Sequence, residues 1–314
     1  MGDSPLSCGN RGCLLMEYDS RLGWTPFIQQ ANELLRENKL LKEDNKELQE
    51  RIKELQDQIE CYKYLQSRIY DDVAPIKESY YDYRNRVHRL VNEKACFPPE
   101  WEYFHTSPGL NKKFDEYGRF KSFYGDTTVF NLPVNVKSAL FELHNELYGC
   151  AGHMLSERLP PDTFHITLHD LSSGETGDSV KKELELHNRI VPVLVDSMKQ
   201  KGTVRLRSAG IVSMVSSSLV MLFEPVSDTD HNTIQRVYNV MDTVKHLSYP
   251  LTLHCTLAYY KPGNYSPEKW NILVAKVMEL NQRKPIEVEL DCTKLEYQHF
   301  SSMKEYYQVF EESC

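Results

Sequence analysis

The chain has 314 residues, of which 40% are hydrophobic and 11% aromatic, and its formal net charge is −8. This length and apolar content exclude a mainly disordered chain and allow one large domain or two medium ones. The acidic balance argues against a protein that grips long nucleic acid, because that grip comes from Lys and Arg side chains that neutralise phosphates. A small phosphorylated substrate stays compatible with this charge.

The first residues and the cysteine pattern indicate the cellular compartment of the protein. The opening stretch, MGDSPLSCGN, has no basic segment followed by an apolar one, so we expect no signal peptide. The eight cysteines are scattered without a C-x-x-C pair, which favours reduced thiols over a disulfide framework or a zinc site. No window approaches about eighteen uncharged apolar residues, the length of a membrane span. We therefore predict a soluble, cytoplasmic protein with no membrane contact.

The N-terminal quarter of the chain divides into a tail and a long helix. Residues 1–24 are rich in Gly, Ser and Asp without periodicity and predict a flexible tail. In residues 25–67, leucines recur every seven positions, and Asn or Ile follows four positions after each of them. The first series is Leu34, Leu41, Leu48 and Leu55, and the second is Asn38, Asn45, Ile52 and Ile59. These series fit the d and a positions of a coiled coil.

The composition of this seam favours a parallel two-stranded coil. Leucine at d with Ile or Asn at a is typical of dimers, and Asn at a weakens the seam while penalising other registers. We therefore expect self-association through residues 27–66, with Phe27 and Tyr62 at its two ends. The alternative is a single amphipathic helix that folds back on its own domain. The narrow a/d stripe suits a coiled coil better than a globular surface.

Residues 68–100 predict a helical connector that resumes after a break at Pro75. Its apolar side chains recur at helical spacing, which indicates packing against a core rather than a ligand site. They are Tyr80, Tyr83, Val87, Leu90 and Val91. The paired prolines of FPPEW then end the helical region, because proline cannot continue a helix. We place the start of the last domain, residues 101–314, at this point.

Strand and helix patterns interleave along residues 101–314. The expected strands are 126–133, 164–171, 203–215, 218–225, 251–260, 286–298 and 306–312, and the expected helices are 135–149, 179–200 with a kink at Pro192, 229–246 and 267–282. The order falls into two similar halves. It predicts an α+β domain with an internal pseudo-two-fold relation.

Each half contains one strand with a His-x-Thr pair. FHITLHDL (164–171) places His165 and Thr167 on one face, and TLHCTLAYY (252–260) does the same with His254 and Thr256. Six of the eleven histidines fit His-x-Ser or His-x-Thr, so the pattern alone is weak. Only these two lie in the middle of an apolar strand. The alternative for each is a half-buried histidine that merely bonds the backbone.

The paired motifs suit the hydrolysis of a phosphodiester. In-line displacement needs a base that takes a proton from the attacking oxygen and an acid that protonates the leaving oxygen, and imidazole serves both roles near neutral pH. The hydroxyls of Thr167 and Thr256 can donate to the non-bridging oxygens, where charge builds in the transition state. This chemistry needs no metal and no cofactor, and the sequence offers no carboxylate cluster for a metal ion.

Two His-x-Thr strands about ninety residues apart, in the form F-H-I-T-L and L-H-C-T-L, resemble the 2H phosphoesterase superfamily. The resemblance covers roughly residues 120–300. It implies a bilobal fold with antiparallel sheets, flanking helices and a central groove, with His165 and His254 as the acid/base pair and Thr167 and Thr256 as phosphate-binding hydroxyls. Which histidine is the base stays open. The coiled coil lies outside the family core.

Two further candidates follow from the strand pleat. His169 and Tyr260 lie two and four positions beyond the threonines, on the same faces, and are expected to line the ends of the groove as substrate-binding residues. We thus predict a metal-independent phosphodiesterase that hydrolyses a cyclic phosphate or a small nucleotide-like diester. The alternative is a non-catalytic nucleotide-binding or scaffold protein that assembles partners through its coiled coil.

Overall fold

The computed structural model describes residues 25–69, 77–92 and 97–309. The chain divides into two compact units, Met1–Leu55 and Gln56–Cys314. This division falls inside the first helix, α1 (Thr25–Ile69). The domain boundaries expected near residues 67 and 100 stay predictions. The expected tail at 1–24 and the expected break at Pro75 lie outside the described residues.

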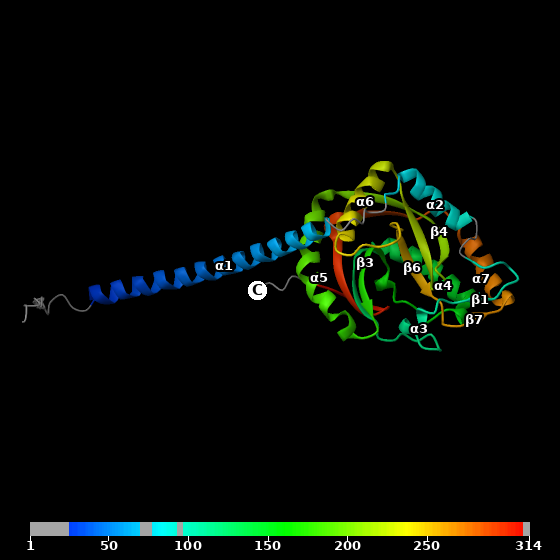
Figure 1. Ribbon diagram of the computed structural model, residues 1–314, viewed down its shortest axis with the longest axis horizontal. Coiled ribbons are helices and arrows are strands. Elements are labelled where there is room, and N and C mark those ends of the chain that lie inside the picture. Colours follow the sequence, from blue (N-terminus) through cyan, green and yellow to red (C-terminus); the bar gives the residue numbers. More distant parts are fainter. Residues whose placement is uncertain (1–24, 70–76, 93–96, 310–314) are drawn as a thin grey trace, which may run out of the picture. The chain divides into compact units, whose positions relative to one another are not determined.

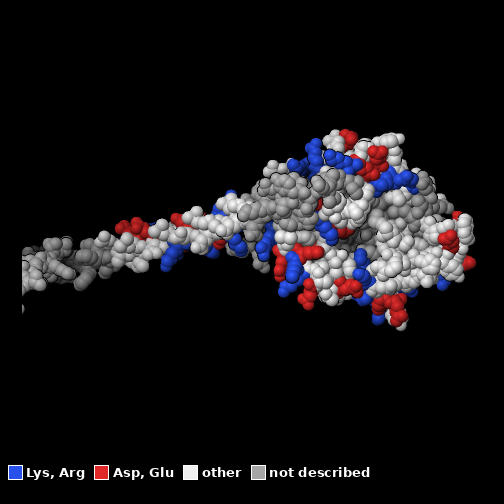
Figure 2. All heavy atoms as spheres, viewed as in Figure 1, with Lys and Arg blue, Asp and Glu red and all other residues white. Residues whose placement is uncertain are grey.

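The long N-terminal helix expected from the heptads is present as α1 (Thr25–Ile69). The leucines and isoleucines of its seam are more than two-fifths exposed in the single chain. Acidic and basic side chains alternate along its surface (Figure 2), with ion pairs between Lys46 and Glu50 and between Arg51 and Glu54. Within the described residues, no helix has the length and apolar character that a bilayer crossing requires. The coiled coil itself stays a prediction.

Antiparallel sheets with flanking helices form the rest of the described chain (Figure 1). Within residues 97–309 there are two four-stranded sheets, in the orders β10-β9-β2-β3 and β6-β5-β4-β8, and one two-stranded sheet, β1-β7. The strands are β1 (Phe104–His105), β2 (Tyr124–Asn131), β3 (His165–Gly174), β4 (Thr203–Met214), β5 (Ser218–Pro225), β6 (His254–Tyr259), β7 (Asn264–Tyr265), β8 (Glu287–Asp291), β9 (Leu295–Ser302) and β10 (Glu305–Gln308). The expected mixed fold with antiparallel sheets is confirmed.

The two His-x-Thr strands occupy equivalent places in different sheets. Strand β3 is the edge of the first four-stranded sheet, and β6 is the edge of the second. The two edges lie next to each other (Figure 1), so residues 89 positions apart in the sequence meet in space. The pseudo-two-fold relation between the halves stays a prediction.

Helices connect the strands and cover the sheets. They are α2 (Tyr80–Asn92), α3 (Leu110–Lys113), α4 (Val134–Ala151), α5 (Gly177–Met198), α6 (Asp228–Asp242) and α7 (Pro267–Leu280). In α4, Val136, Leu140 and Leu147 follow the helical repeat and are buried, as their spacing predicts. A hydroxyl caps α5 and α6, because Thr176 accepts from the Ser179 N–H and Ser227 from the Asp230 N–H.

The expected connector contributes a helix to the globular unit. Tyr83 and Val87 of α2 are fully buried, and the Tyr83 hydroxyl donates to the Phe223 carbonyl at 2.9 Å. The same hydroxyl accepts from the Leu253 N–H at 3.1 Å, directly before the second motif histidine. The apolar spacing in this segment therefore does mark core packing, and α2 holds one end of β6.

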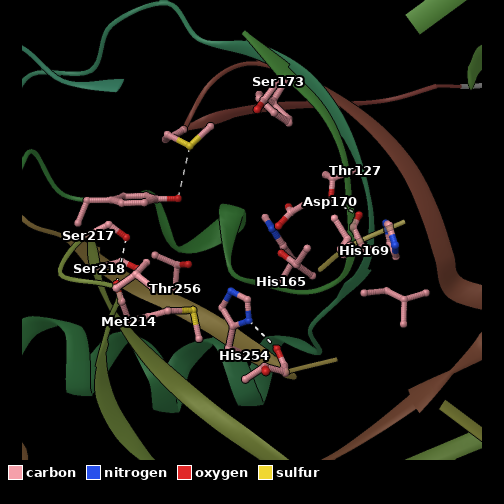
Figure 3. Close-up of a pocket in the computed structure, with 18 of the residues that line it drawn as sticks. Thr127, His165, His169, Asp170, Ser173, Met214, Ser217, Ser218, His254 and Thr256 are labelled. Carbon is pink, nitrogen blue, oxygen red and sulfur yellow. Dashed lines mark hydrogen bonds between the residues drawn. The ribbon is translucent and has the colours of Figure 1, made fainter. Parts of the chain in front are cut away.

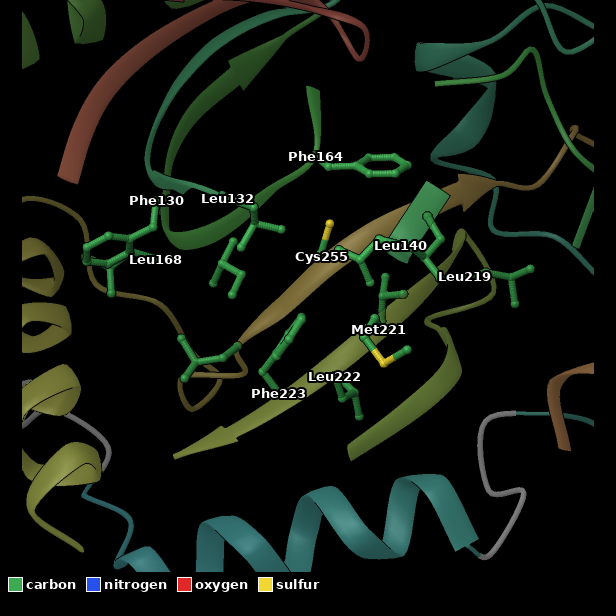
Figure 4. Packing of buried hydrophobic residues seen from close by; sticks show 14 of the residues in the cluster. Phe130, Leu132, Leu140, Phe164, Leu168, Leu219, Met221, Leu222, Phe223 and Cys255 are labelled. Atoms are coloured by element: carbon green, nitrogen blue, oxygen red, sulfur yellow. The ribbon is translucent and has the colours of Figure 1, made fainter. Parts of the chain in front are cut away.

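Figure 4 shows the apolar packing behind the motif strands. The residues that alternate with the motif residues all point into this core, which explains why the strands have a polar and an apolar face. They are Phe164, Ile166 and Leu168 in the first motif and Leu253, Cys255 and Leu257 in the second.

One expected strand is wrong. Residues 286–298 form two strands, β8 and β9, which belong to different sheets and are separated by the 3-10 turn η4 (Cys292–Lys294). The Asp291 carboxylate accepts from the Thr293 N–H at 2.9 Å, and the Cys292 N–H donates to the Gly202 carbonyl. These local bonds let the chain cross between sheets, and the apolar alternation on either side conceals the break.

Candidate active site

A cavity of about 870 Å³ opens between the two motif strands (Figure 3). Its wall comes from β3 and β6, the turn between β4 and β5, the loop after α6, and the ends of α3 and β9. Its size lies in the upper part of the range for small-molecule sites, roughly 300–1,000 Å³. All four motif residues, His165, Thr167, His254 and Thr256, line it, and each is partly exposed.

Each motif histidine has one ring nitrogen fixed by the backbone two residues before it. His254 Nδ1 donates to the Thr252 carbonyl at 2.8 Å, and His165 is hydrogen-bonded to the backbone of Thr163. A carbonyl can only accept, so the bond places a proton on that nitrogen and leaves the other for the cavity. Figure 3 shows both imidazoles in this space.

The environment of His165 favours its neutral form. Burial is the main cause that lowers the pKa of His165 to about 4, and the nearby imidazole of His254 adds to the effect. The Thr163 carbonyl and the Asp170 carboxylate act in the opposite direction. The Tyr306 ring meets the His165 ring edge to face, with 4.9 Å between centroids. His165 is therefore unprotonated at neutral pH, in the state that a general base requires.

A β-bulge follows the threonine in both motif strands. Thr167 pairs with Val129 and His169 with Thr128, so Leu168 is the extra residue in β3. Thr256 pairs with Val220 and Ala258 with Leu219, so Leu257 is the extra residue in β6. A bulge adds one residue on one strand and breaks the strict alternation of faces. The next side chains that face the cavity are consequently three positions beyond each threonine.

These residues are Asp170 and Tyr259, which the sequence pattern missed. Asp170 is exposed in the cavity and acts electrostatically on His165. The hydroxyl of Tyr259 is hydrogen-bonded to Thr256 and lies 3.4 Å from the Met303 sulfur. Each lies three positions beyond the threonine of its motif. The sequence could therefore predict both residues only if the bulges were anticipated.

Tyr260 and His169, which the strand pleat predicts to line the ends of the groove, lie in other positions in the structure. Tyr260 is fully buried away from the cavity, with its ring 4.7 Å from that of Phe104, so the expected groove-lining position is wrong. His169 borders the cavity but is only 1% exposed. Its Nε2 lies 3.3 Å from Asp242 and its ring packs on Tyr238, both in α6. The bulges are the reason in both cases; a substrate-binding role for His169 stays a prediction.

The cations of the cavity were also missed by the sequence patterns. Among the described residues that line the cavity, the basic side chains are those of Lys113 and Lys245. Lys245 Nζ donates to the Leu171 carbonyl, and Lys113 lies at the end of α3 between aromatic rings. Neither stands near a motif in the sequence, and no local periodicity marks them.

No family model and no curated protein matches the chain. Among solved structures it is similar to ATU0111 of Agrobacterium tumefaciens, a conserved protein of unknown function, at 14% identity and a TM-score of 0.47 over 71% of this chain and 97% of that one. It is also similar to Escherichia coli LigT complexed with 3′-AMP, at 10% identity and a TM-score of 0.39 over 60% and 96%. It is similar to TT0787 of Thermus thermophilus as well, at 15% identity and a TM-score of 0.36 over 60% of this chain and 94% of that one. Similarities at this level assign neither a family nor an activity to the chain.

Proposed function

We propose that the chain is a metal-independent phosphodiesterase that hydrolyses a cyclic phosphate or a small nucleotide-like diester by two-histidine acid/base catalysis. One observation carries this proposal: two separate sheets each contribute one imidazole and one threonine hydroxyl to a single open cavity. If the two histidines served only core packing and backbone hydrogen bonding, we would not expect both to face the same solvent-accessible cavity with a threonine hydroxyl beside each.

In the proposed reaction, neutral His165 takes a proton from a water molecule as the water oxygen attacks phosphorus. The bond between phosphorus and the ester oxygen breaks, and His254 gives its proton to that leaving oxygen. The products are an alcohol and a phosphomonoester. Thr167 and Thr256 donate to the non-bridging oxygens, which hold more charge in the transition state than in the diester. His165 is assigned as the base because burial keeps it neutral at pH 7.

The test is an assay of 2′,3′-cyclic nucleotides, cyclic dinucleotides and 2′,5′-linked oligomers with EDTA present. We expect turnover of at least one of these classes, and we expect His165→Ala and His254→Ala each to lower kcat by about 10²–10⁴. His105→Ala is the matched control, because His105 belongs to a His-x-Ser pair, is exposed and hydrogen-bonds Asn264 away from the cavity. Nucleotide binding without turnover would instead support a non-catalytic binding or scaffold protein.

We also propose that α1 pairs with the same helix of a second copy in a coiled coil. In the single chain, Leu41 is 61% exposed and Leu48 is 59% exposed, although both belong to the heptad seam. A row of exposed leucines at this spacing is stabilised by burial against a second helix. The side chains of Phe27 and Tyr62, expected at the ends of the seam, lie outside the described residues.

A further inference from the structure

The cavity holds an ammonium group with no ion-pair partner among the described residues. Lys113 Nζ lies 5.1 Å from the centroid of the Phe123 ring and 5.8 Å from that of Tyr259. Aromatic faces attract a cation, but they replace only part of its hydration. Burial accordingly lowers the pKa of Lys113, and the more distant Asp170 carboxylate offsets this in part. An anion brought by a ligand would restore the lost stabilisation.

The neighbouring lysine shows the contrast. Lys112 is exposed and its Nζ lies 3.5 Å from the Glu175 carboxylate. The second cavity cation, Lys245, donates to the Leu171 carbonyl. Lys113 therefore differs from both, because it is half-buried, lines the cavity and is not committed to a protein acceptor.

Lys113 interacts with two cavity residues that lie beyond the motif threonines in the sequence. It contacts Tyr259, which stands three residues beyond Thr256, and it is electrostatically coupled to Asp170, which stands three residues beyond Thr167. The motif histidines and threonines are sufficient to hold one phosphate, and a cavity of about 870 Å³ has room beyond it.

We propose that the substrate carries a second phosphate group besides the scissile diester, and that Lys113 binds this second group. The proposal rests on the proposed function and narrows it to phosphorylated diesters, such as a cyclic nucleotide with a terminal phosphate. A lysine is suited to this role because it acts as a compact point charge with three donors.

The kinetic test compares adenosine 2′,3′-cyclic phosphate with the same molecule phosphorylated at the 5′ position. In the wild type we expect kcat/KM to favour the 5′-phosphorylated diester by roughly tenfold or more, the effect of one charge-assisted hydrogen bond. Lys113→Gln should bring this ratio of kcat/KM values close to one. Lys113→Arg should restore most of the preference, and Lys112→Gln, the matched control, should retain it.

A binding test separates this proposal from the proposed function. Calorimetry with adenosine 3′-monophosphate and adenosine 3′,5′-bisphosphate needs no turnover. We expect the bisphosphate to bind roughly tenfold more tightly to the wild type and to Lys112→Gln, and without preference to Lys113→Gln. If none of the diester classes assayed is hydrolysed but this preference depends on Lys113, the phosphodiesterase proposal fails and the second phosphate site stands. Equal affinities in the wild type, or a preference that survives in Lys113→Gln, would overturn the site.

Discussion

The two motif histidines share a local arrangement that defines their chemistry. Each has one ring nitrogen bonded to the backbone two residues earlier and the other directed to the cavity. Fixing one nitrogen selects the tautomer and the ring orientation, so that the second nitrogen can exchange a proton with a substrate. The carbonyls of Thr163 and Thr252 are therefore part of the site, although neither side chain is catalytic.

The lowered pKa of His165 predicts the acid side of the rate–pH profile. If His165 is the base, kcat/KM rises as pH increases through the pKa of the free enzyme, about 4, because the proton that blocks the base is then lost. A histidine with its ordinary pKa would place this rise near pH 6.5. On the alkaline side the rate should fall as the general acid loses its proton.

The measurement is kcat/KM from about pH 3 to about pH 9, with circular dichroism at each pH to confirm that the chain stays folded. A rise centred near 6.5 would contradict the assignment of His165 as the base and would favour His254 in that role. A profile that increases steadily into alkali would argue against two-histidine catalysis altogether.

At this scale, the sequence predicts the motif residues but not their neighbours. His165, Thr167, His254 and Thr256 could be found because they alternate with buried apolar residues in a regular strand. Asp170 and Tyr259 could not, because a bulge changes the face of every later side chain and nothing in the local residue types marks it. Lys113 comes from a segment about fifty residues before the first motif, and only the folded chain brings it to the cavity.

At the scale of elements, the bulges leave backbone groups that side chains from elsewhere satisfy. The buried imidazole of His144 in α4 donates from Nδ1 to the Leu257 carbonyl at 2.8 Å, and Leu257 is the extra residue of β6. In β3, the Thr127 hydroxyl donates to the His169 carbonyl at 2.9 Å. Because buried polar groups are costly when unpaired, these bonds hold the irregular strand ends that carry the cavity residues.

Strand β2, which pairs with the first motif strand, depends on a glycine. A Cβ at Gly125 would overlap the Ser172 carbonyl and crowd the Phe300 ring, so Gly125→Ala should lower the free energy of unfolding by about 1–3 kcal/mol. Gly149 in α4 is exposed with open space around its Cα, and Gly149→Ala should raise the free energy of unfolding by about 0.5–1 kcal/mol. Urea unfolding of the two variants and the wild type measures both; a tolerated Gly125→Ala would show that β2 shifts to make room.

The sequence predicts most helices and strands because their apolar residues repeat with the correct period. Val136, Leu140 and Leu147 predict α4 well, and its observed ends lie within two residues of the expected ones. The strand expected at 286–298 fails because apolar alternation continues on both sides of the η4 turn and gives no sign that the partners change. Pairing between distant strands is a tertiary property that local periodicity does not contain.

At the scale of the whole molecule, the heptad seam predicts self-association. Leu41→Glu, at a d position, should weaken dimerisation by at least about 100-fold, because two facing glutamate charges would replace two leucine side chains buried between the helices. Leu40→Glu is the matched control: Leu40 is 53% exposed, comparable to Leu41 at 61%, but it lies at a c position outside the seam. Sedimentation of the wild type and both variants measures the strength of dimerisation. Turnover per chain should be unchanged in each, and a wild type that sediments as a monomer would contradict the coiled coil.

The division of the site between two sheets has a consequence for how activity can be gained or lost. Strands β3 and β6 do not pair with each other, and each is the last strand of its own sheet. The spacing between the proposed acid and the proposed base is thus set by side-chain contacts where the two sheets meet, and not by a backbone ladder. If one sheet shifted by less than an ångström, the distance between the two imidazoles would change while each residue kept its neighbours within its own sheet. Substitutions that repack the contact between the sheets should therefore lower the reaction rate more than they lower the melting temperature.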